Sequence, residues 1–243
     1  MLTVVLWKWH RPGYHRTFTA EHVNAVKRMV DRHYTDPHRF VLVTDDPRGV
    51  HPDITCVPIW DDYAEVPNPC RPDMPSCYRR LKIFARNAAE TFGERILSLD
   101  LDCVIVDDIR PLWNRTEDFV IWEDPSPRQP YNGGMFLLTA GSHPHVWEEF
   151  NPVRSVRAAF EKGYRGSDQA WLAYAIPNAA LWRHGDGILS YKQHVRMRRQ
   201  RHLPPGTKAV MFHGKYNPWD SQIRMTYPWV RANWVPDPQP QAA

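Results

Sequence analysis

Residues 95–106 read Arg95-Ile-Leu-Ser-Leu-Asp100-Leu-Asp102-Cys-Val-Ile-Val106, two apolar runs with a pair of carboxylates between them. Runs this rich in Ile, Leu and Val are typical of a strand that is buried on both faces of a sheet. An unpaired carboxylate is very costly to bury, so two of them beside such a strand indicate that a cation binds there. Because residues i and i+2 of extended chain point the same way, Asp100 and Asp102 can present oxygens to one Mg²⁺ or Mn²⁺ ion.

The composition is that of a globular protein with one or two domains. The chain has 243 residues, of which 42% are hydrophobic and 24% are charged, which is ordinary for a soluble protein with a substantial core. No apolar run approaches the roughly 18 residues that span a bilayer. The first residues resemble a strand and not a signal peptide, so we expect a cytoplasmic protein.

The net charge and the cysteines give little information about the binding partners of the protein. A net charge of +4 is mild, and we expect no nucleic-acid partner. The four cysteines have no metal-type spacing, and they are Cys56, Cys70, Cys77 and Cys103. In a chain without a secretory signal they are expected to be reduced thiols, with a bridge between Cys70 and Cys77 as the alternative.

The opening of the chain alternates strand and helix patterns. Residues 3–9 are apolar and β-branched, and Thr19 can cap a helix that continues to about His33 with its apolar side chains on one stripe. Strand patterns follow at residues 40–43 and 54–58. This β-α-β-β opening favours an α/β fold with a mainly parallel sheet flanked by helices.

The later elements continue the same pattern. Strands are predicted at 119–122, 135–138 and 208–212, and helices at 78–92, 145–150, 153–163 and 168–176. Four prolines within residues 66–76 predict a loop there. We expect residues 1–235 to form a single domain. Residues 236–243 hold three prolines and two glutamines and nothing to bury, which predicts a disordered tail.

Two segments are strongly basic. The first turn of the predicted 78–92 helix carries Arg79, Arg80 and Lys82 directly before the strand with the carboxylates, so these cations either form a solvated face or contact an anionic ligand. Residues 190–202 contain no acid and five cations, namely Lys192, Arg196, Arg198, Arg199 and Arg201. This segment could face a polyanionic acceptor or an anionic membrane surface, and a solvated segment is the alternative.

Two further groups of polar residues fall at the ends of predicted elements. Asn132-Gly133-Gly134 precedes a strand, where two glycines let the backbone approach a ligand closely or simply form a hairpin turn. Asp168 and Gln169 begin a helix, where the helix dipole favours an acidic residue in any case.

Taken together, five segments resemble the metal-dependent sugar-nucleotide transferases of the GT-A fold, and among them family 8, which includes glycogenin and bacterial lipopolysaccharide galactosyltransferases. The likeness covers roughly residues 1–219. The similar segments are Tyr78-Arg-Arg80-Leu-Lys82, Leu99-Asp100-Leu-Asp102 with Arg110-Pro-Leu-Trp113, Tyr131-Asn-Gly-Gly134, Asp168-Gln169, and His213-Gly214 with Pro218-Trp219. The resemblance implies a Rossmann-like, mixed but mainly parallel sheet in a single domain.

The resemblance also implies roles for particular residues. The metal, Mn²⁺ or Mg²⁺, would be held by Asp100, Asp102 and His213 against the diphosphate of a UDP-sugar. The donor would be bound by Arg80, Lys82, Asp100, Asn132, Gly133, Gly134, Gly214 and Lys215. Asp168 and Gln169 would be catalytic and would stabilise an oxocarbenium-like state. The implied activity is transfer of a hexose, with retention, to a glycan, lipid or protein acceptor; in an inverting enzyme Asp168 would be the base.

Two features depart from the pattern of that family. Asn217 stands where a phosphate-binding Lys precedes Pro-Trp, and Lys215 is the candidate for that charge from a shifted position. The first strand lacks the usual Asp-x-x-Tyr nucleotide signature, which leaves Trp7 and Tyr14 as candidates for stacking on the base.

Two other functions remain as alternatives at this stage. Leu99-Asp100-Leu-Asp102-Cys-Val also fits the nucleophile strand of haloacid-dehalogenase-like phosphatases, although no later pair of acids follows a strand with suitable spacing. A non-catalytic nucleotide- or glycan-binding module with the same fold is the other alternative.

Overall fold

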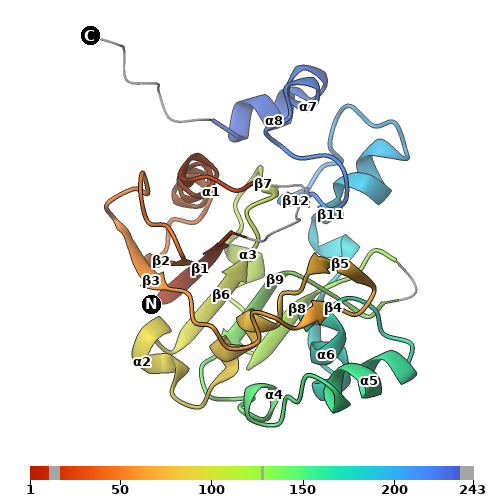
Figure 1. Cartoon of the computed structure of the whole chain (residues 1–243). Coiled ribbons are helices and arrows are strands. Elements are labelled where there is room, and N and C mark those ends of the chain that lie inside the picture. Colours follow the sequence, from red (N-terminus) through yellow and green to blue (C-terminus); the bar gives the residue numbers. More distant parts are fainter. Residues whose placement is uncertain (11–16, 127–128, 236–243) are drawn as a thin grey trace.

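A seven-stranded, mainly parallel sheet forms the centre of the protein (Figure 1). The computed structural model describes residues 1–10, 17–126 and 129–235. The strand order is β10-β8-β9-β6-β1-β2-β3, and β9 is antiparallel to β6 and β8 while the other neighbours are parallel. The strands are β1 (Leu2–Lys8), β2 (His38–Thr44), β3 (Ile54–Pro58), β6 (Arg95–Leu99), β8 (Phe119–Glu123), β9 (Tyr131–Thr139) and β10 (Ala180–Trp182). The predicted α/β fold with its mainly parallel sheet is confirmed.

The central strands are buried on both faces, which explains their continuous apolar runs. In β1, Val4 and Leu6 belong to one core while Val5 and Trp7 belong to the other. The first core lies under α1 (Ala20–His33). The second core lies under five helices, η1 (Tyr78–Phe84), α2 (Ala88–Phe92), α4 (His145–Glu148), α5 (Arg154–Glu161) and α6 (Asp168–Ala175).

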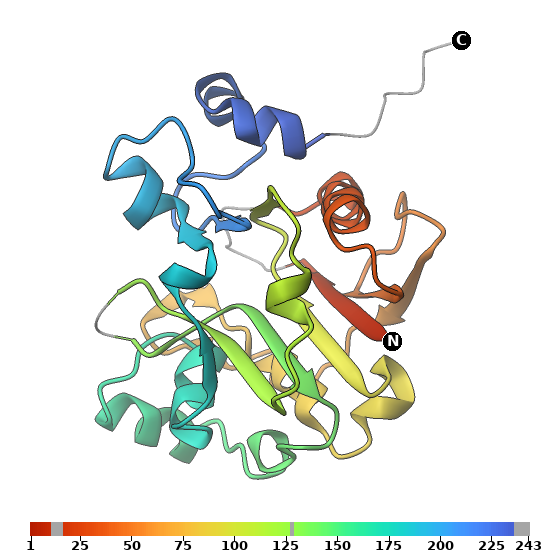
Figure 2. The ribbon, with the colours of Figure 1, turned by 180° about the vertical axis from the view of Figure 1, so that it is seen from behind.

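A second, smaller sheet lies on the same side of the central sheet as α1 (Figure 2). Its order is β11-β12-β7, formed by β11 (Ile188–Ser190), β12 (Ala209–Met211) and β7 (Cys103–Ile105). Around it lie α3 (Arg110–Trp113), η2 (His184–Asp186), the π-helix η3 (Tyr191–Arg196), α7 (Ser221–Thr226) and α8 (Pro228–Asn233). No helix in the described ranges is long and apolar enough to cross a membrane.

The stretch that was predicted as one strand is divided between the two sheets. β6 ends at Leu99 and β7 begins at Cys103, so the carboxylates lie on the connection between them. The N–H of Asp100 donates to the Gly134 carbonyl at 2.8 Å, whereas the carbonyl of Asp102 accepts from Phe212 N–H at 2.8 Å. Because Asp100 bonds to the central sheet and Asp102 bonds beside the small sheet, no single extended strand includes both carboxylates.

Two other predictions are wrong in detail. Residues 66–76 are not a loop, because β4 (Pro67–Asn68) and β5 (Arg71–Pro75) pair as a two-stranded ribbon. Such a ribbon consists of edges only, where the missing N–H of proline is tolerated. The helix predicted over 78–92 is broken, since η1 ends at Phe84, Ala85 is extended, and α2 starts at Ala88.

The 3₁₀ geometry of η1 has a packing reason. Its three residues per turn place Tyr78, Leu81 and Phe84 on one face, and all three are buried. All four cysteines are free, so the bridge between Cys70 and Cys77 is absent. The predicted tail, 236–243, lies outside the described residues.

Candidate functional site

A cavity of about 260 Å³ at the carboxyl end of β6 gathers most of the predicted site residues, and it is here called the donor pocket after the role that the sequence predicts for them. Ligands of open α/β sheets bind beyond the carboxyl ends of the strands, so the position suits a substrate. The predicted residues that line it are Arg80, Asp100, Asp102, Asn132, Gly133, Gly134, Asp168, Gln169, His213 and Gly214. They come from η1, the β6–β7 connection, β9, α6 and the segment after β12.

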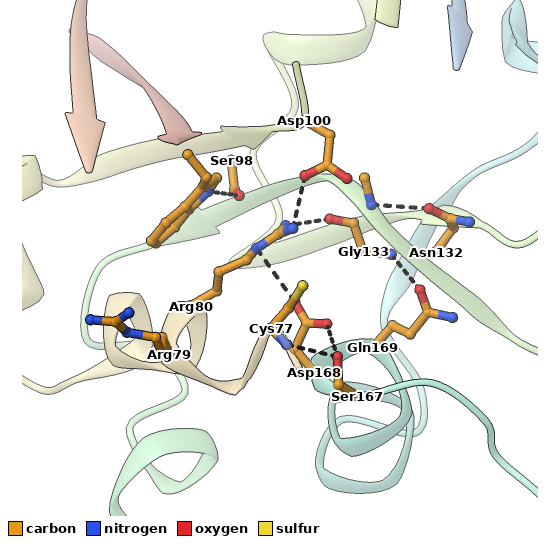
Figure 3. A network of polar contacts seen from close by, with 12 residues as sticks. Cys77, Arg79, Arg80, Ser98, Asp100, Asn132, Gly133, Ser167, Asp168 and Gln169 are labelled. Carbon is orange, nitrogen blue, oxygen red and sulfur yellow. Dashed lines mark hydrogen bonds and ion pairs between the residues drawn. The ribbon is translucent and has the colours of Figure 1, made fainter. Parts of the chain in front are cut away.

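Arg80 joins three of these segments (Figure 3). Its Nη1 donates to Asp100 Oδ1 at 2.8 Å, and its Nη2 donates to the Gly133 carbonyl at 2.5 Å. Its Nε lies 3.4 Å from Asp168 Oδ2. The residue is 5% exposed, so of the two alternatives for this basic cluster the solvated face is excluded for Arg80.

The charges around Arg80 are balanced within the protein. Burial acts to lower the pKa of Arg80, but the charges of Asp100 and Asp168 outweigh it, so the pKa is raised and the group stays cationic. Burial raises the pKa of Asp168, and Arg80 opposes that shift. The contact between Nε and Oδ2 is an ion pair without a hydrogen bond, so within the described part of the chain neither atom has a hydrogen-bond partner.

Trp7 supports the guanidinium from behind. The Cζ atom of Arg80 lies 5.5 Å from the centroid of the Trp7 ring, within the range of a cation–π contact. The indole Nε1 donates to Ser98 Oγ at 2.8 Å, and the residue is 5% exposed. A ring that is buried in this way has no free face for a base, so the prediction for Trp7 is wrong. Tyr14 lies outside the described residues.

The two glycines lie in β9 itself, so the hairpin alternative for Asn132-Gly133-Gly134 is excluded. A Cβ on Gly134 would lie 3.1 Å from Asn132 Oδ1 and 3.3 Å from Met211 Cε. Asn132 is held on both sides, because its Oδ1 accepts from Gly134 N–H at 3.0 Å and its Nδ2 donates to Asp124 Oδ2 at 2.9 Å. The sequence alone did not indicate Asp124.

The start of α6 is fastened to the neighbouring elements. Ser167 Oγ donates to Asp168 Oδ1 at 3.2 Å and accepts from Cys77 N–H at 3.0 Å. Gln169 Oε1 accepts from Gly133 N–H at 3.4 Å. These bonds place the Asp168 and Gln169 side chains against η1 and β9 (Figure 3), and nothing in the local sequence indicated this role of Ser167.

Asp100, Asp102 and His213 line the donor pocket together. Two carboxylates and one imidazole suit Mn²⁺ by ligand type. As the side chains lie, Asp100 bonds to Arg80, and His213 Nε2 is 2.6 Å from Ser190 Oγ. Over the ranges that the structure covers, no three His, Cys, Asp or Glu side chains are grouped as a metal site. The metal therefore stays a prediction, with a donor set that fits it in chemical type.

Two predicted donor-binding residues lie away from the donor pocket. Lys82 Nζ bonds to Asp62 Oδ2 at 2.7 Å. Lys215 lines a separate cavity of about 270 Å³, which shares His213 and Gly214 with the donor pocket.

The fold, but not the sequence, matches known proteins. No protein-family profile and no curated protein matches the sequence. The galactosyltransferase LgtC, crystallised with donor and acceptor sugar analogues, superposes with a TM-score of 0.63 at 15% identity over 98% of both chains. A structure of its active-site Gln-to-Glu mutant gives 0.61 at 14% identity, again over 98% of both chains.

Two longer proteins share the same fold. The glycosyltransferase GlyE of Streptococcus pneumoniae gives a TM-score of 0.60 at 12% identity, with 96% of this chain matching 62% of that one. For the bifunctional glycosyltransferase WbbM the TM-score is 0.58 at 12% identity, with 96% of this chain matching 49% of that one. The protein thus has the GT-A fold of glycosyltransferases, a group that includes the family 8 enzyme LgtC, as its motifs predicted.

Proposed function

We propose that the protein is a metal-dependent glycosyltransferase that moves a hexose from a UDP-sugar to an acceptor, with retention of configuration. The observation that carries the proposal is the buried Arg80, which binds Asp100 and the Gly133 carbonyl and faces Asp168 at the base of the donor pocket. A cation held in this way keeps two carboxylates in place before any substrate arrives. Such preorganised charge is what stabilises a transition state in which charge develops.

Asp100, Asp102 and His213 would hold Mn²⁺ or Mg²⁺. The ion would supply a Lewis acid for the negative charge that collects on the leaving UDP. Asn132, Gly133 and Gly134 would let the donor sugar approach β9 closely, because a side chain on Gly134 would already crowd its neighbours.

Asp168 and Gln169 are the proposed catalytic residues. Oδ1 of Asp168 accepts from Ser167, and Oδ2 faces Arg80. Because both oxygens face protein groups, Asp168 suits electrostatic stabilisation of a positive sugar ring better than removal of a proton from an acceptor, which favours retention. A glutamine is part of the active site of LgtC, and Gln169 is the glutamine of this donor pocket.

The acceptor would bind in a third cavity, of about 440 Å³, which shares Trp122 with the donor pocket. Glu123, Asp124, His184 and His194 line this cavity and could bond to the hydroxyl groups of a sugar. A glycan is therefore the acceptor class that we favour over a protein.

A cytoplasmic location with peripheral contact with an anionic membrane is also proposed. In residues 192–201, Arg198, Arg199 and Arg201 are exposed, and Met197, directly before them, is 63% exposed. Cations around an exposed apolar side chain suit a lipid surface, although such contacts are individually weak.

Calorimetry with UDP tests the metal and the nucleotide together. UDP should bind in the presence of Mn²⁺ and bind much more weakly in EDTA, and uridine should bind weakly in both buffers. Equal affinity for UDP with and without the ion would refute the metal assignment.

Turnover separates the remaining functions. Release of UDP from a UDP-sugar supports the transferase, and binding without turnover would identify a non-catalytic module. Hydrolysis of a phosphomonoester would identify a phosphatase, which the fold comparisons do not support.

A further inference from the structure

The cavity that contains Lys215, here called the basic cavity, is a second feature of the site. Its volume is about 270 Å³, and it joins the donor pocket at His213 and Gly214. Three cations line it, namely Lys192, Arg196 and Lys215, together with two aromatic side chains, Tyr191 and Tyr216. The sequence places Lys192 and Arg196 in the basic segment 190–202 and Lys215 after the last strand, and the fold brings the three together.

The π-helix η3 places two of these cations and is tied directly to the donor pocket. Its preceding residue, Ser190, accepts from Gln193 N–H at 3.1 Å, and the same Oγ is 2.6 Å from His213 Nε2. The Tyr191 ring stacks on Phe212, with ring centroids 4.3 Å apart and planes at 10°. Short π-helical segments occur frequently at functional sites, because they re-aim side chains that an α-helix would direct elsewhere.

The cations of the basic cavity are not neutralised by the protein. Arg196 Cζ lies 5.2 Å from the centroid of the Tyr216 ring, and Lys215 Nζ lies 5.9 Å from it. Among the residues that the structure describes, none of the three cations forms a salt bridge with a carboxylate. Positive charge concentrated in a cavity attracts an anionic ligand.

The one nearby acid in the sequence is used elsewhere. Asp220 is the only acid between residues 188 and 235. It accepts from Asn217 N–H at 2.8 Å and from Asn217 Nδ2 at 3.3 Å. Asn217, which stands where the similar family has a phosphate-binding Lys, is therefore occupied by a local bond and lines neither cavity. The charge that this position lacks is present instead in the basic cavity.

We propose that the basic cavity is a phosphoryl-binding subsite, in which Lys192, Arg196 and Lys215 bind phosphate oxygens of a ligand that extends past His213 and Gly214. This assignment rests on the proposed function. The phosphoryl group has two sources, the diphosphate of the donor or a phosphate carried by the acceptor. Both present the same anionic oxygens to the same cations, so their binding chemistry is shared.

Binding measurements on the double variant Lys192→Ala/Arg196→Ala test the proposal. Charge-assisted bonds of this kind are strong enough that losing two should weaken phosphoryl binding about tenfold or more. Calorimetry measures the affinity for UDP, for uridine and for inorganic pyrophosphate. Pyrophosphate is titrated both into the free protein and into protein that is saturated with UDP. The matched control is Arg231→Ala, which removes an exposed cation outside the basic cavity.

The pattern of results identifies the source. Weaker UDP binding with unchanged uridine binding assigns the subsite to the donor diphosphate. Unchanged UDP binding, with loss of pyrophosphate binding to the UDP-saturated protein, assigns it to a second phosphorylated ligand. Arg196→Lys should retain most of the binding in either case, and equal melting temperatures should show that the variants fold.

Failure of this proposal can be told apart from failure of the transferase assignment. If wild-type protein binds pyrophosphate through Lys192 and Arg196 but does not bind UDP, the subsite stands and the proposed function fails. If the double variant binds UDP and pyrophosphate as the Arg231→Ala control does, the subsite is refuted whatever the donor is.

Discussion

Replacing Arg80 with methionine removes the charge at the centre of the site while keeping much of the side-chain volume. In the wild type the guanidinium bonds to Asp100 and the Gly133 carbonyl and pairs with Asp168, which is itself 6% exposed. Removing one partner of a buried pair costs about 3–5 kcal/mol, because the other charge stays buried alone. For a domain of this size that loss lowers the Tm by roughly 6–20 °C.

The loss in Arg80→Met should depend on pH through Asp168. Burial raises the pKa of this carboxyl, and without Arg80 the pKa in the folded state lies still higher. A carboxyl with a raised folded-state pKa costs nothing below its unfolded pKa, near 3.9, and costs progressively more as pH rises to the folded value. The stability difference between wild type and Arg80→Met should therefore be smaller near pH 4 than at pH 8.

Urea unfolding at the two pH values measures these differences. The variant Asp168→Asn and the double variant Arg80→Met/Asp168→Asn complete a cycle that isolates the pair. The double variant should regain part of the stability lost in Arg80→Met, since the buried charge of Asp168 is removed together with its partner. Arg86→Met is the control, because Arg86 pairs with Glu148 at the surface and should lose less than about 1 kcal/mol. Equal losses in Arg80→Met and Arg86→Met would refute the buried ion pair.

The remaining predictions concern the donor pocket. Asp168→Asn and Gln169→Ala should keep UDP affinity within a few-fold but lose about 10²-fold in turnover of a UDP-sugar, because contacts made mainly in the transition state appear in kcat; a silent Asp168→Asn would overturn its catalytic role. Asp100→Asn should instead lose UDP binding, as calorimetry would report, and unchanged affinity would remove Asp100 from the metal set. Gly134→Ala should cost about 1–3 kcal/mol in urea unfolding, because its Cβ would crowd Asn132 and Met211; wild-type stability would show that β9 has room there.

Local chemistry was sufficient to place six of the seven strands of the central sheet, all but β10. The apolar residues of β1 are buried on both faces, and this double burial was readable from their unbroken run. Asp100 was recognised because it interrupts an apolar segment, where a polar side chain needs a partner, whereas Asn132 and Asp168 were assigned through their resemblance to known motifs. An apolar run and a carboxylate that interrupts it involve only residues that are close together in the chain, so they can be recognised from a single sequence.

Three cations of one helical turn show what the sequence could not decide. Arg79 Nε donates to the Trp60 carbonyl at 2.7 Å, Lys82 bonds to Asp62, and Arg80 alone enters the donor pocket. Their local patterns are alike, and the partners that distinguish them lie about twenty positions or more away in the chain.

The tertiary structure also decided which segments meet around His213. The Ser190 hydroxyl, at the end of the neighbouring strand β11, contacts this imidazole, and η3 then brings Lys192 and Arg196 beside Lys215. Asn217 is next to this group in sequence but is turned onto Asp220. Such contacts depend on how two sheets pack and not on spacing along the chain. The basic cavity could therefore be recognised only from the tertiary structure.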